Sequence, residues 1–483
     1  MTDAQEQPSV DMLPDGRYVV VWQSNGQDGD LLGVYARIYD VNNMPGSEIE
    51  VNMTTLASQS EARVAVMPNG NFVVTWNGFD ISQRGVFARV FLANGTPLTD
   101  EFQVNTFTNE AQRGPDIAMD INGNFVIVWE SFTQEPGAGF NTGVYGQRFT
   151  AAGVKVGPEF LINVTTAGSQ HNAAVAMSPG GSFVVVWQTP AQEGDGEGIY
   201  ARRYDAAGNP LSGEFRVNGF FTGTQALPDI DMDDAGKFII TWVSENQDGD
   251  DFGIFAKLYA ANGSVAISEF QVNTITAGVQ SAPHVDMDAD GDFVITFYSF
   301  DGIISEDIFA RRYNNAGIAQ GIEFLVNSYT TNYQGNPAVS MSEVGKLIIV
   351  WDGSLDGIET SGVGAQLFGV PNLSAVLAQN GPCATPVPGA IDLTVTPAGA
   401  YSYAWSNGAA TEDLNNLAAG TYTVTVSQVG GCSATGTYII ACQSAPIPTV
   451  GQWGILCLFI ILCLPGISLL KYAGTNQVPI TDK

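Results

Sequence analysis

The sequence predicts an all-β protein built around a seven-bladed β-propeller, and three observations lead to that fold class. The segment that begins at Pro8 returns six more times before residue 370, with a period of about fifty-five residues, close to that of propeller blades. The apolar runs are short and β-branched, and Gly, Asn and Asp turns separate them, which is typical of hairpins. One large aromatic residue closes an apolar run in every copy. These residues are Trp22, Trp76, Trp129, Trp187, Trp242, Phe297 and Trp351.

Each copy is expected to form a four-stranded antiparallel sheet. In the first copy, the strands are predicted near residues 10–12, 18–22, 33–39 and 48–52. Radial packing of such sheets buries both faces of the second strand. This burial explains why the second strand is continuously apolar instead of alternating.

The third and fourth strands of most copies carry side chains of opposite charge. In the first copy Arg37 would face Glu48 across the two strands. Such pairs stabilise a sheet by about 0.2–1 kcal/mol, so the sequence predicts cross-strand ion pairs that belong to the scaffold.

The last blade is expected to lack its outer strand. The seventh copy ends near Phe368 without the Glu-Phe-x-Val-Asn pattern of earlier copies. In those copies the pattern precedes a Gln by a few residues, and this chain begins just before the equivalent Gln5. We therefore expect residues ahead of Met1 in the natural gene to supply the strand. The alternative is an authentic start with an open or three-stranded last blade.

The composition agrees with an extracellular repeat protein. With 49 acidic and 18 basic residues the net charge is −31, which argues against nucleic acid or anionic membrane surfaces as partners and favours cations. The 55 Gly and the charged fraction of 14% reflect strands and turns, not disorder. None of the five Cys lies within residues 1–370, the predicted propeller.

Residues 371–443 are expected to form a separate small β domain. Apolar and alternating Thr/Val runs predict strands at 391–395, 401–405 and 420–426. The stretch 401–440 resembles the SprB repeat, an immunoglobulin-like module of surface adhesins in gliding Bacteroidetes. The likeness is carried by Tyr403, Trp405, Ser406, Asn407, Gly408, Leu417, Gly420, Thr421 and Tyr422.

The SprB resemblance implies a surface β-sandwich. Cys383 and Cys432 lie where such a module could bridge its two ends, and a disulfide would be stable outside the cell. Cys442 is a third candidate, so the pairing stays open.

Residues 444–483 contain the features that predict where the protein is located. An apolar run over 455–470 precedes Lys471 and predicts a C-terminal hydrophobic helix. The segment resembles the IPTL-type sorting signal of bacterial surface proteins, through Pro448, Thr449, Trp453 and Gly454. The resemblance implies C-terminal processing, and the alternative is a plain single-pass membrane anchor. Both interpretations place the propeller at the cell surface or outside the cell.

The sequence gives no sign of an enzyme. Its two histidines, His171 and His284, occupy different positions of the repeat and are expected to be isolated. No Gly-x-Ser-x-Gly, His-Glu-x-x-His or phosphate-binding Gly motif is present, and the turns lack the order of sialidase Asp boxes. We therefore expect no catalytic residues.

Two polar sets are candidates for the axial channel. On the first strand, the face opposite the apolar one holds Asp11, Asp231 and Asp286. These carboxylates should crowd one side of the channel and either raise one another's pKa or hold a cation. A Gln also begins every copy, either at the channel mouth or as a partner of backbone groups between blades. These are Gln5, Gln59, Gln112, Gln170, Gln225, Gln280 and Gln334.

Acidic loops make calcium the candidate cofactor. Asp28 and Asp30, and likewise Asp248 and Asp250, flank a Gly in loops between the second and third strands. Their oxygens suit a hard cation. Asp290 and Asp292 form a second candidate set. The alternative is solvated loops and an ordinary hairpin turn.

Together these features favour a non-enzymatic cell-surface recognition or adhesion protein that binds a glycan or a surface protein. The alternatives are a secreted polysaccharide hydrolase or lyase that uses carboxylates at the channel mouth, and a purely structural surface-layer component. The expected partners are the surface ligand and, through the C-terminal helix, the envelope membrane, but not nucleic acid.

Overall fold

The computed structural model describes residues 4–80, 83–135, 141–190, 196–300, 306–342, 346–354, 361–369, 372–382, 388–396, 401–428 and 433–443. These residues form strands and turns and no helix, so the protein is all-β over its described part. None of them forms a helix long and apolar enough to cross a membrane. The predicted helix over 444–483, its sorting motif at Pro448, Thr449, Trp453 and Gly454, and the pair Cys383 and Cys432 lie outside the described residues.

The chain divides into two compact units, and the larger one contains residues 1–372. In that unit each repeat forms one antiparallel sheet with its strands in sequence order. The first strands are β1 (Gln5–Met12), β5 (Ser60–Val66), β9 (Gln112–Met119), β13 (His171–Met177), β17 (Gln225–Met232), β21 (Val279–Met287) and β25 (Gln334–Met341). The second strands are β2 (Tyr18–Asn25), β6 (Phe72–Phe79), β10 (Phe125–Phe132), β14 (Phe183–Thr189), β18 (Phe238–Glu245), β22 (Phe293–Phe300) and β26 (Leu347–Ser354).

The outer strands complete each sheet. The third strands are β3 (Leu32–Tyr39), β7 (Arg84–Phe91), β11 (Thr142–Phe149), β15 (Gly198–Tyr204), β19 (Phe252–Tyr259), β23 (Glu306–Tyr313) and β27 (Ser361–Phe368). The fourth strands are β4 (Pro45–Glu50), β8 (Phe102–Gln103), β12 (Lys155–Leu161), β16 (Phe215–Arg216), β20 (Val265–Gln271) and β24 (Phe324–Leu325). Among the described residues, the sheet of β25, β26 and β27 has three strands.

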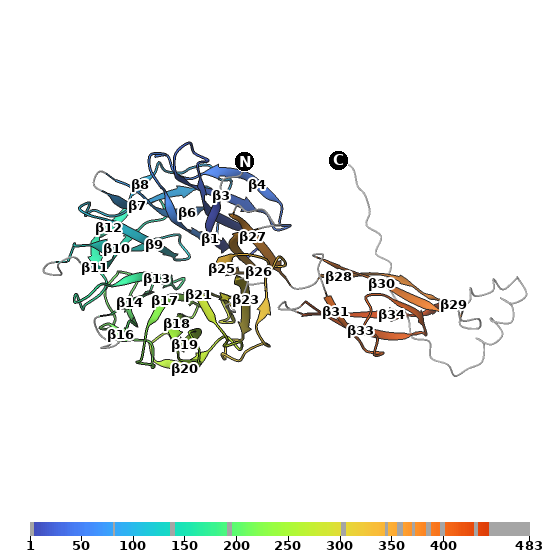
Figure 1. Cartoon of the computed structure of the whole chain (residues 1–483). Helices are drawn as coiled ribbons and strands as arrows, with labels where there is room; N and C mark the ends of the chain where they lie inside the picture. Colours follow the sequence, from blue (N-terminus) through green and yellow to red (C-terminus); the bar gives the residue numbers. More distant parts are fainter. Residues whose placement is uncertain are drawn as a thin grey trace, which may run out of the picture. The chain divides into compact units, whose positions relative to one another are not determined.

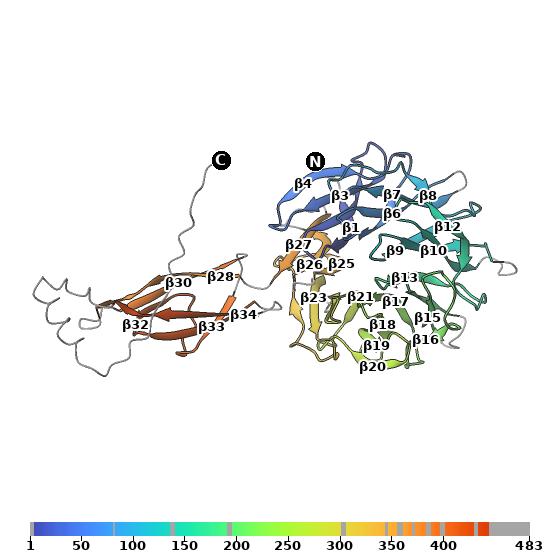
Figure 2. The ribbon, with the colours of Figure 1, turned by 180° about the vertical axis from the view of Figure 1, so that it is seen from behind.

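The sheets are arranged in a ring, with the first strands nearest the centre and the fourth strands outside (Figure 1, Figure 2). Each first strand contacts the first strand of the next repeat, and β25 contacts β1. The described sheets therefore form a closed, β-propeller-like arrangement around an axis.

Apolar side chains fill the spaces between neighbouring sheets. One cluster joins the last sheet to the first, with Val10 and Tyr35 packed with Ala338 and Val350. The aromatic residues that close the second strands lie in these spaces and are 0% to 6% exposed. Full burial of a large apolar side chain stabilises a fold by about 1.5–3 kcal/mol. The repeated aromatic residue therefore acts as a packing element between sheets.

Charged side chains of the outer strands link one repeat to the next. The expected cross-strand pair forms in the first sheet, where Arg37 Nη2 lies 3.0 Å from Glu48 Oε2. In a later sheet, Arg202 Nη1 donates to the backbone oxygen of Ile162 in the preceding repeat at 2.7 Å. The Glu of the fourth strand accepts backbone N–H groups of the preceding repeat. Most of these charges thus act between sheets, which the sequence pattern does not show.

The second unit contains two three-stranded sheets, β28-β30-β32 and β31-β33-β34, and a short parallel pair of β29 and β35. Its buried side chains include Ile391, Leu393, Trp405, Val424 and Val426. The strands are β28 (Asn372–Ala378), β29 (Asn380–Pro382), β30 (Gly389–Thr396), β31 (Tyr401–Trp405), β32 (Leu414–Leu417), β33 (Gly420–Gln428), β34 (Ser433–Ile440) and β35 (Cys442–Gln443).

Candidate functional site

Every first strand carries a β-bulge at the same position. The bulged residue has a left-handed backbone, with φ between 46° and 61°, and this conformation costs a non-glycine residue about 1–3 kcal/mol. Bulges re-aim the side chains beside them, and strained backbone of this kind gathers at functional sites. The bulged residues are Gln7, Glu61, Gly114, Asn172, Leu227, Ala282 and Asn336.

The bulged residues line a cavity of about 600 Å³, here called the mouth pocket. All repeats of the ring contribute to it through their first strands, so it lies on the axis of the ring. Its wall carries both signs of charge and both histidines of the chain. The ionisable residues in the wall are Glu61, Arg63, Arg84, Arg113, Asp116, Glu130, His171, Asp229 and His284.

Side chains of the preceding sheet fix the bulges. Glu130 Oε1 accepts the N–H of Asn172 at 2.7 Å, and Asp352 Oδ2 accepts the N–H of Gln7 at 2.7 Å. The other oxygen of Glu130 lies 3.0 Å from Arg113 Nε. The strained turns are therefore held by hydrogen bonds, which pre-organises the wall of the mouth pocket.

Two aspartates stand in the wall two residues after a bulge. Asp116 Oδ2 accepts the N–H of Val175 at 2.7 Å, and Asp229 makes the same kind of bond to the next first strand at 2.8 Å. Burial raises the pKa of Asp116 to about 6; the Arg63 guanidinium opposes this rise and the Asp229 carboxylate adds to it. The pocket therefore holds one carboxyl group that is partly protonated near pH 6 and a second carboxylate close enough to affect it.

The histidines meet at this pocket, although the sequence predicted isolated ones. His284 Nδ1 lies 3.7 Å from Asp229 Oδ2. Burial lowers the pKa of His284, which favours a neutral imidazole at pH 7. His171 Nε2 lies 3.1 Å from Glu197 Oε1. Both rings thus lie beside carboxylates in a shared wall.

Sequence analysis missed the layer of Asp116, Asp229 and His284. It selected Asp231 and Asp286, which lie two residues farther along β17 and β21. Residues two apart share a face of a strand, so the same alternation points to Asp229 and His284. The alternation of side chains along the first strands was visible in the sequence, but it was used only for the layer of Asp231 and Asp286.

The three predicted channel carboxylates, Asp11, Asp231 and Asp286, come together in the next layer. Each accepts a backbone N–H of the following first strand at 2.6 Å. Burial raises the pKa of Asp11 to about 6 and that of Asp231 to about 8, with Asp229 and Asp11 adding to the rise at Asp231. The pKa of Asp286 is also raised, first by burial and then by Asp231 and Asp11.

This layer predicts a stability that falls as the pH rises. The pKa values in the folded state lie above the unfolded value of about 3.9, so the folded state binds more protons between about pH 4 and pH 8 and loses stability over that window. We expect Asp231→Asn, which keeps an oxygen acceptor, to melt higher than wild type at pH 8 and equally at pH 4. An equal gain at both pH values would rule out ionisation as the cause.

The glutamines that begin each repeat do not line the mouth pocket. Gln112 Nε2 donates to the backbone oxygen of Asn109 at 3.1 Å, and its Oε1 accepts from Asn105 Nδ2 at 3.0 Å. Gln5 is half-buried in β1. The others hold loop backbone in similar ways and are at most 1% exposed. They are Gln59, Gln170, Gln225, Gln280 and Gln334.

Most of the carboxylates proposed for calcium accept hydrogen bonds from neighbouring segments of the chain. Asp248 Oδ2 accepts from Asn273 Nδ2 at 2.9 Å, and Asp250 Oδ2 accepts the N–H of Gly278 at 3.1 Å. The carboxylates of Asp28, Asp30 and Asp292 accept similar bonds, whereas Asp290 donates its backbone N–H to Asp288 Oδ1 at 3.1 Å. Over the described ranges, no group of three or more His, Cys, Asp or Glu could hold a metal ion.

Calcium at these loops stays a prediction. It requires a higher melting temperature in excess calcium than in chelator, because a ligand of the folded state stabilises it by mass action. The double variant Asp248→Ala, Asp250→Ala should lose part of that gain. Equal melting temperatures in calcium and chelator would leave the loops as hydrogen-bonded turns.

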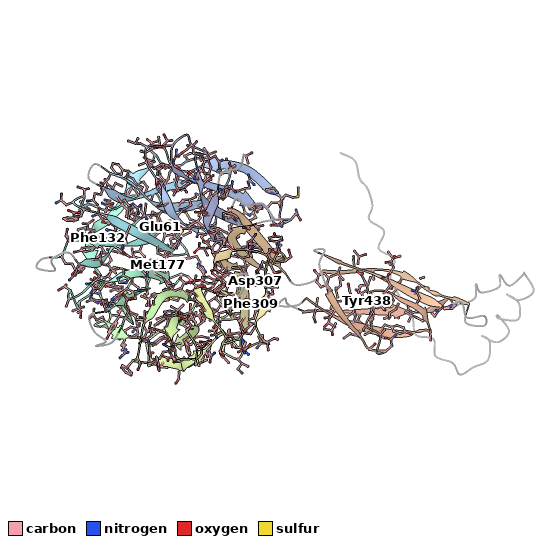
Figure 3. All side chains as sticks on the ribbon, in the orientation of Figure 1. Glu61, Phe132, Met177, Asp307, Phe309 and Tyr438 are labelled. Atoms are coloured by element: carbon pink, nitrogen blue, oxygen red, sulfur yellow. The ribbon has the colours of Figure 1, made fainter. Side chains whose placement is uncertain are left out.

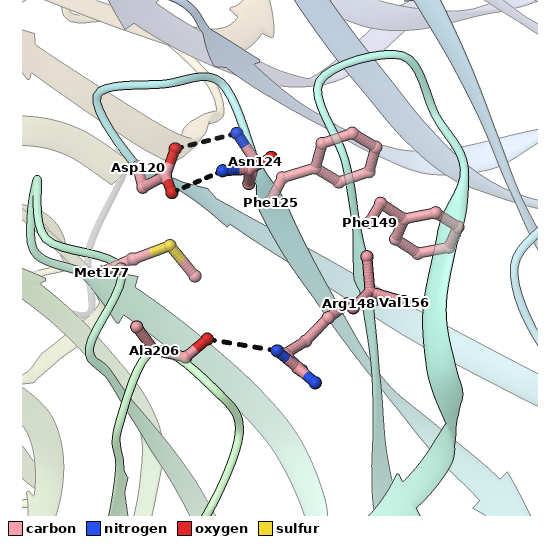
Figure 4. A pocket seen from close by; sticks show the side chains of 9 residues that line it. Asp120, Asn124, Phe125, Arg148, Phe149, Val156, Met177 and Ala206 are labelled. Carbon is pink, nitrogen blue, oxygen red and sulfur yellow. Dashed lines mark hydrogen bonds between the residues drawn. The ribbon is translucent and has the colours of Figure 1, made fainter.

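Another cavity, of about 230 Å³, lies between the third and fourth sheets (Figure 4). There Arg148 Nη1 donates to the backbone oxygen of Ala206 at 3.1 Å, and Asp120 accepts hydrogen bonds from Asn124. An equivalent cavity with Arg203 in its wall, of about 240 Å³, lies between the next two sheets. A feature that recurs between sheets belongs to their packing, so the mouth pocket is the candidate site.

No protein-family model and no curated protein matches the sequence. Solved structures with a similar fold include a protein of unknown function from Dyadobacter fermentans, at TM-score 0.43 and 10% identity, covering 75% of this chain and 94% of that chain. Another is an α-L-arabinanase from Penicillium chrysogenum complexed with arabinobiose, at TM-score 0.43 and 11% identity, covering 76% of this chain and 93% of that chain. A third is the GH93 α-L-arabinofuranosidase of Fusarium graminearum, also with arabinobiose, at TM-score 0.42 and 12% identity, with the same two coverages.

These comparisons correct two predictions from the sequence. Several solved structures of similar fold are named as arabinofuranosidases, arabinanases or other glycoside hydrolases, and this finding contradicts the interpretation as a non-enzymatic recognition or adhesion protein and the expectation of no enzyme. The sequence search failed because it looked for motifs within one segment, whereas this pocket collects carboxylates from different repeats. At 10–15% identity the likeness concerns the fold alone, so a proposal about chemistry has to be argued from the mouth pocket itself.

Proposed function

We propose that the chain is a glycoside hydrolase that cleaves a polysaccharide in the mouth pocket. One observation carries the proposal: a carboxyl group with its pKa raised to about 6, Asp116, shares the pocket wall with a second carboxylate, Asp229, that influences it. Most glycoside hydrolases use such a pair, one member as acid and the other as base or nucleophile. A raised pKa is what the acid needs in order to be protonated at its working pH.

In the proposed reaction, Asp116 donates its proton to the glycosidic oxygen as the bond to the sugar carbon breaks. Asp229 stabilises the positive charge that develops on the sugar ring and takes a proton from the attacking water. The backbone N–H bonds to both carboxylates hold them in position. His284, whose pKa is lowered by burial, lies 3.7 Å from Asp229.

We further propose that the ring has seven blades, the last without an outer strand, and that residues 371–443 form an SprB-like immunoglobulin-like sandwich. The contacts that close the ring of first strands support the blade count. The sequence patterns support a hydrophobic sorting or membrane segment over 444–483 and a location at the cell surface or outside the cell. The net charge of −31 opposes nucleic acid as a partner.

The test is product release from a panel of polysaccharides. Arabinan belongs in the panel because two of the compared structures hold arabinobiose. We expect new reducing ends with at least one polysaccharide, and a rate that falls above about pH 6 as Asp116 loses its proton. No release from any polysaccharide between pH 4 and pH 8 would count against the proposal.

A further inference from the structure

A second cavity adjoins the mouth pocket between the second and third repeats. This side pocket, of about 520 Å³, is lined by Phe79, Gln83, Arg84, Glu110, Ala111, Arg113 and Phe132. Arg84 and Arg113 line both cavities, so the two form one groove that runs from the axis outward. Glu61 of the mouth pocket and Phe132 of the side pocket are labelled in Figure 3.

Three arginines stand among the carboxylates of the mouth pocket and at its junction with the side pocket. The whole chain has 18 basic residues against 49 acidic ones, yet three arginines, Arg63, Arg84 and Arg113, line the mouth pocket. Only Arg113 has a carboxylate within ion-pair distance among the described residues, Glu130 at 3.0 Å. Arg84 therefore keeps its charge for a ligand, in a protein that otherwise repels anions, whereas Arg63 lies close enough to Asp116 to lower the pKa of that carboxyl group.

Aromatic rings stand beside these arginines. Phe79 is 47% exposed, although phenylalanine is among the residues most often buried in folded proteins. The Arg113 guanidinium lies 4.9 Å from the centre of the Phe132 ring, a cation–π distance that holds the arginine in place. The side pocket thus combines an open apolar ring face with fixed positive charge, which suits a flat sugar ring that carries an anion.

We infer that the groove binds an acidic polysaccharide, whose sugar units carry carboxylate groups. Guanidinium groups bind carboxylates through paired hydrogen bonds, and the side pocket would hold the units next to the cleavage point. The inference rests on the proposed function, because the mouth pocket is then the place where the bound chain is cut. The cation at the junction, Arg84, is exposed and makes no ion pair in the described part of the chain.

The experiment measures binding of a galacturonic acid oligomer and of its methyl ester by calorimetry. The ester has the same rings without the charge. With the Asp116→Asn variant, to prevent cleavage, we expect the acid to bind about tenfold more tightly than the ester and more weakly at high salt. Adding Arg84→Gln should remove the difference, Phe79→Ala should weaken both ligands, and Arg17→Gln, on a distant turn, should change neither.

Equal affinity for the acid and the ester would overturn the inference. So would an Arg84→Gln variant that melts like wild type and still prefers the acid to the ester. The two proposals fail separately. Hydrolysis of neutral polysaccharides without preference for the acid leaves the proposed function and removes the acidic substrate. Tight binding of the acid with no cleavage by wild type leaves the binding groove and removes the hydrolase.

Discussion

The Asp116→Asn variant is expected to lose polysaccharide hydrolysis by about 10²–10⁴-fold, the usual contribution of a general acid. Asparagine keeps an oxygen that can accept the N–H of Val175, bonded at 2.7 Å in the wild type. The variant should therefore fold and melt like wild type, and its loss should appear in kcat. Initial rates of reducing-end release measure the effect.

Asp120→Asn is the matched control. Asp120 belongs to the same repeat but accepts its hydrogen bonds within a turn, from Asn122 and Asn124. It should retain the wild-type rate. A wild-type rate in Asp116→Asn, or an equal loss in both variants, would remove Asp116 from the catalytic step.

A chain extended ahead of Met1 by a Glu-Phe-Gln-Val-Asn segment, with its Asn seven residues before Gln5, is expected to melt roughly 5 °C higher. In the sixth sheet, the residues that follow the equivalent strand make two hydrogen bonds to Ile308. Asn327 Oδ1 accepts the N–H of Ile308 at 2.7 Å, and the N–H of Val326 donates to the backbone oxygen of Ile308 at 2.8 Å. The last sheet has no such strand beside β27 among the described residues. Burying one Phe and one Val side chain contributes about 3 kcal/mol or more, which is several degrees for a unit of this size.

The position of the added strand follows from the other repeats. There the Asn of the fourth strand precedes the Gln of the next repeat by seven residues and donates to it. Ser361 Oγ of β27 donates to the backbone oxygen of Gln5 at 3.4 Å, so Gln5 itself lies beside this edge. A scrambled segment of equal length is the control. The same melting temperature for both extensions would show that the edge does not accept a strand.

Much of the scaffold could be predicted from the sequence. A large aromatic residue such as Trp187, which is 0% exposed, stands at the same position of every copy. Buried positions require apolar side chains, so the pattern of burial is visible in the sequence as a pattern of apolar residues. Beyond the pair of Arg37 and Glu48, the partners of the charged outer-strand residues could not be predicted, because a residue such as Arg202 reaches a carbonyl of another repeat. Contacts between repeats leave no local pattern.

The candidate site was predictable only in part. Asp231 was found because acidic residues on a strand face are visible in the sequence. The bulges could not be predicted, because most of the residues with a left-handed backbone, such as Glu61 and Leu227, are not glycines, the residue type that usually marks this conformation. Asp116 and Asp229 come from different repeats, on β9 and β17, and the arrangement of the first strands around one axis brings them to one pocket.

The most direct test of the account is a crystal structure of the Asp116→Asn variant with an oligosaccharide that wild type cleaves. The account predicts the sugar in the mouth pocket, with the bond to be cleaved between the side chains at positions 116 and 229 and further units toward Arg84. A sugar bound instead in the cavity of Asp120 and Arg148, with the mouth pocket free of sugar, would contradict it.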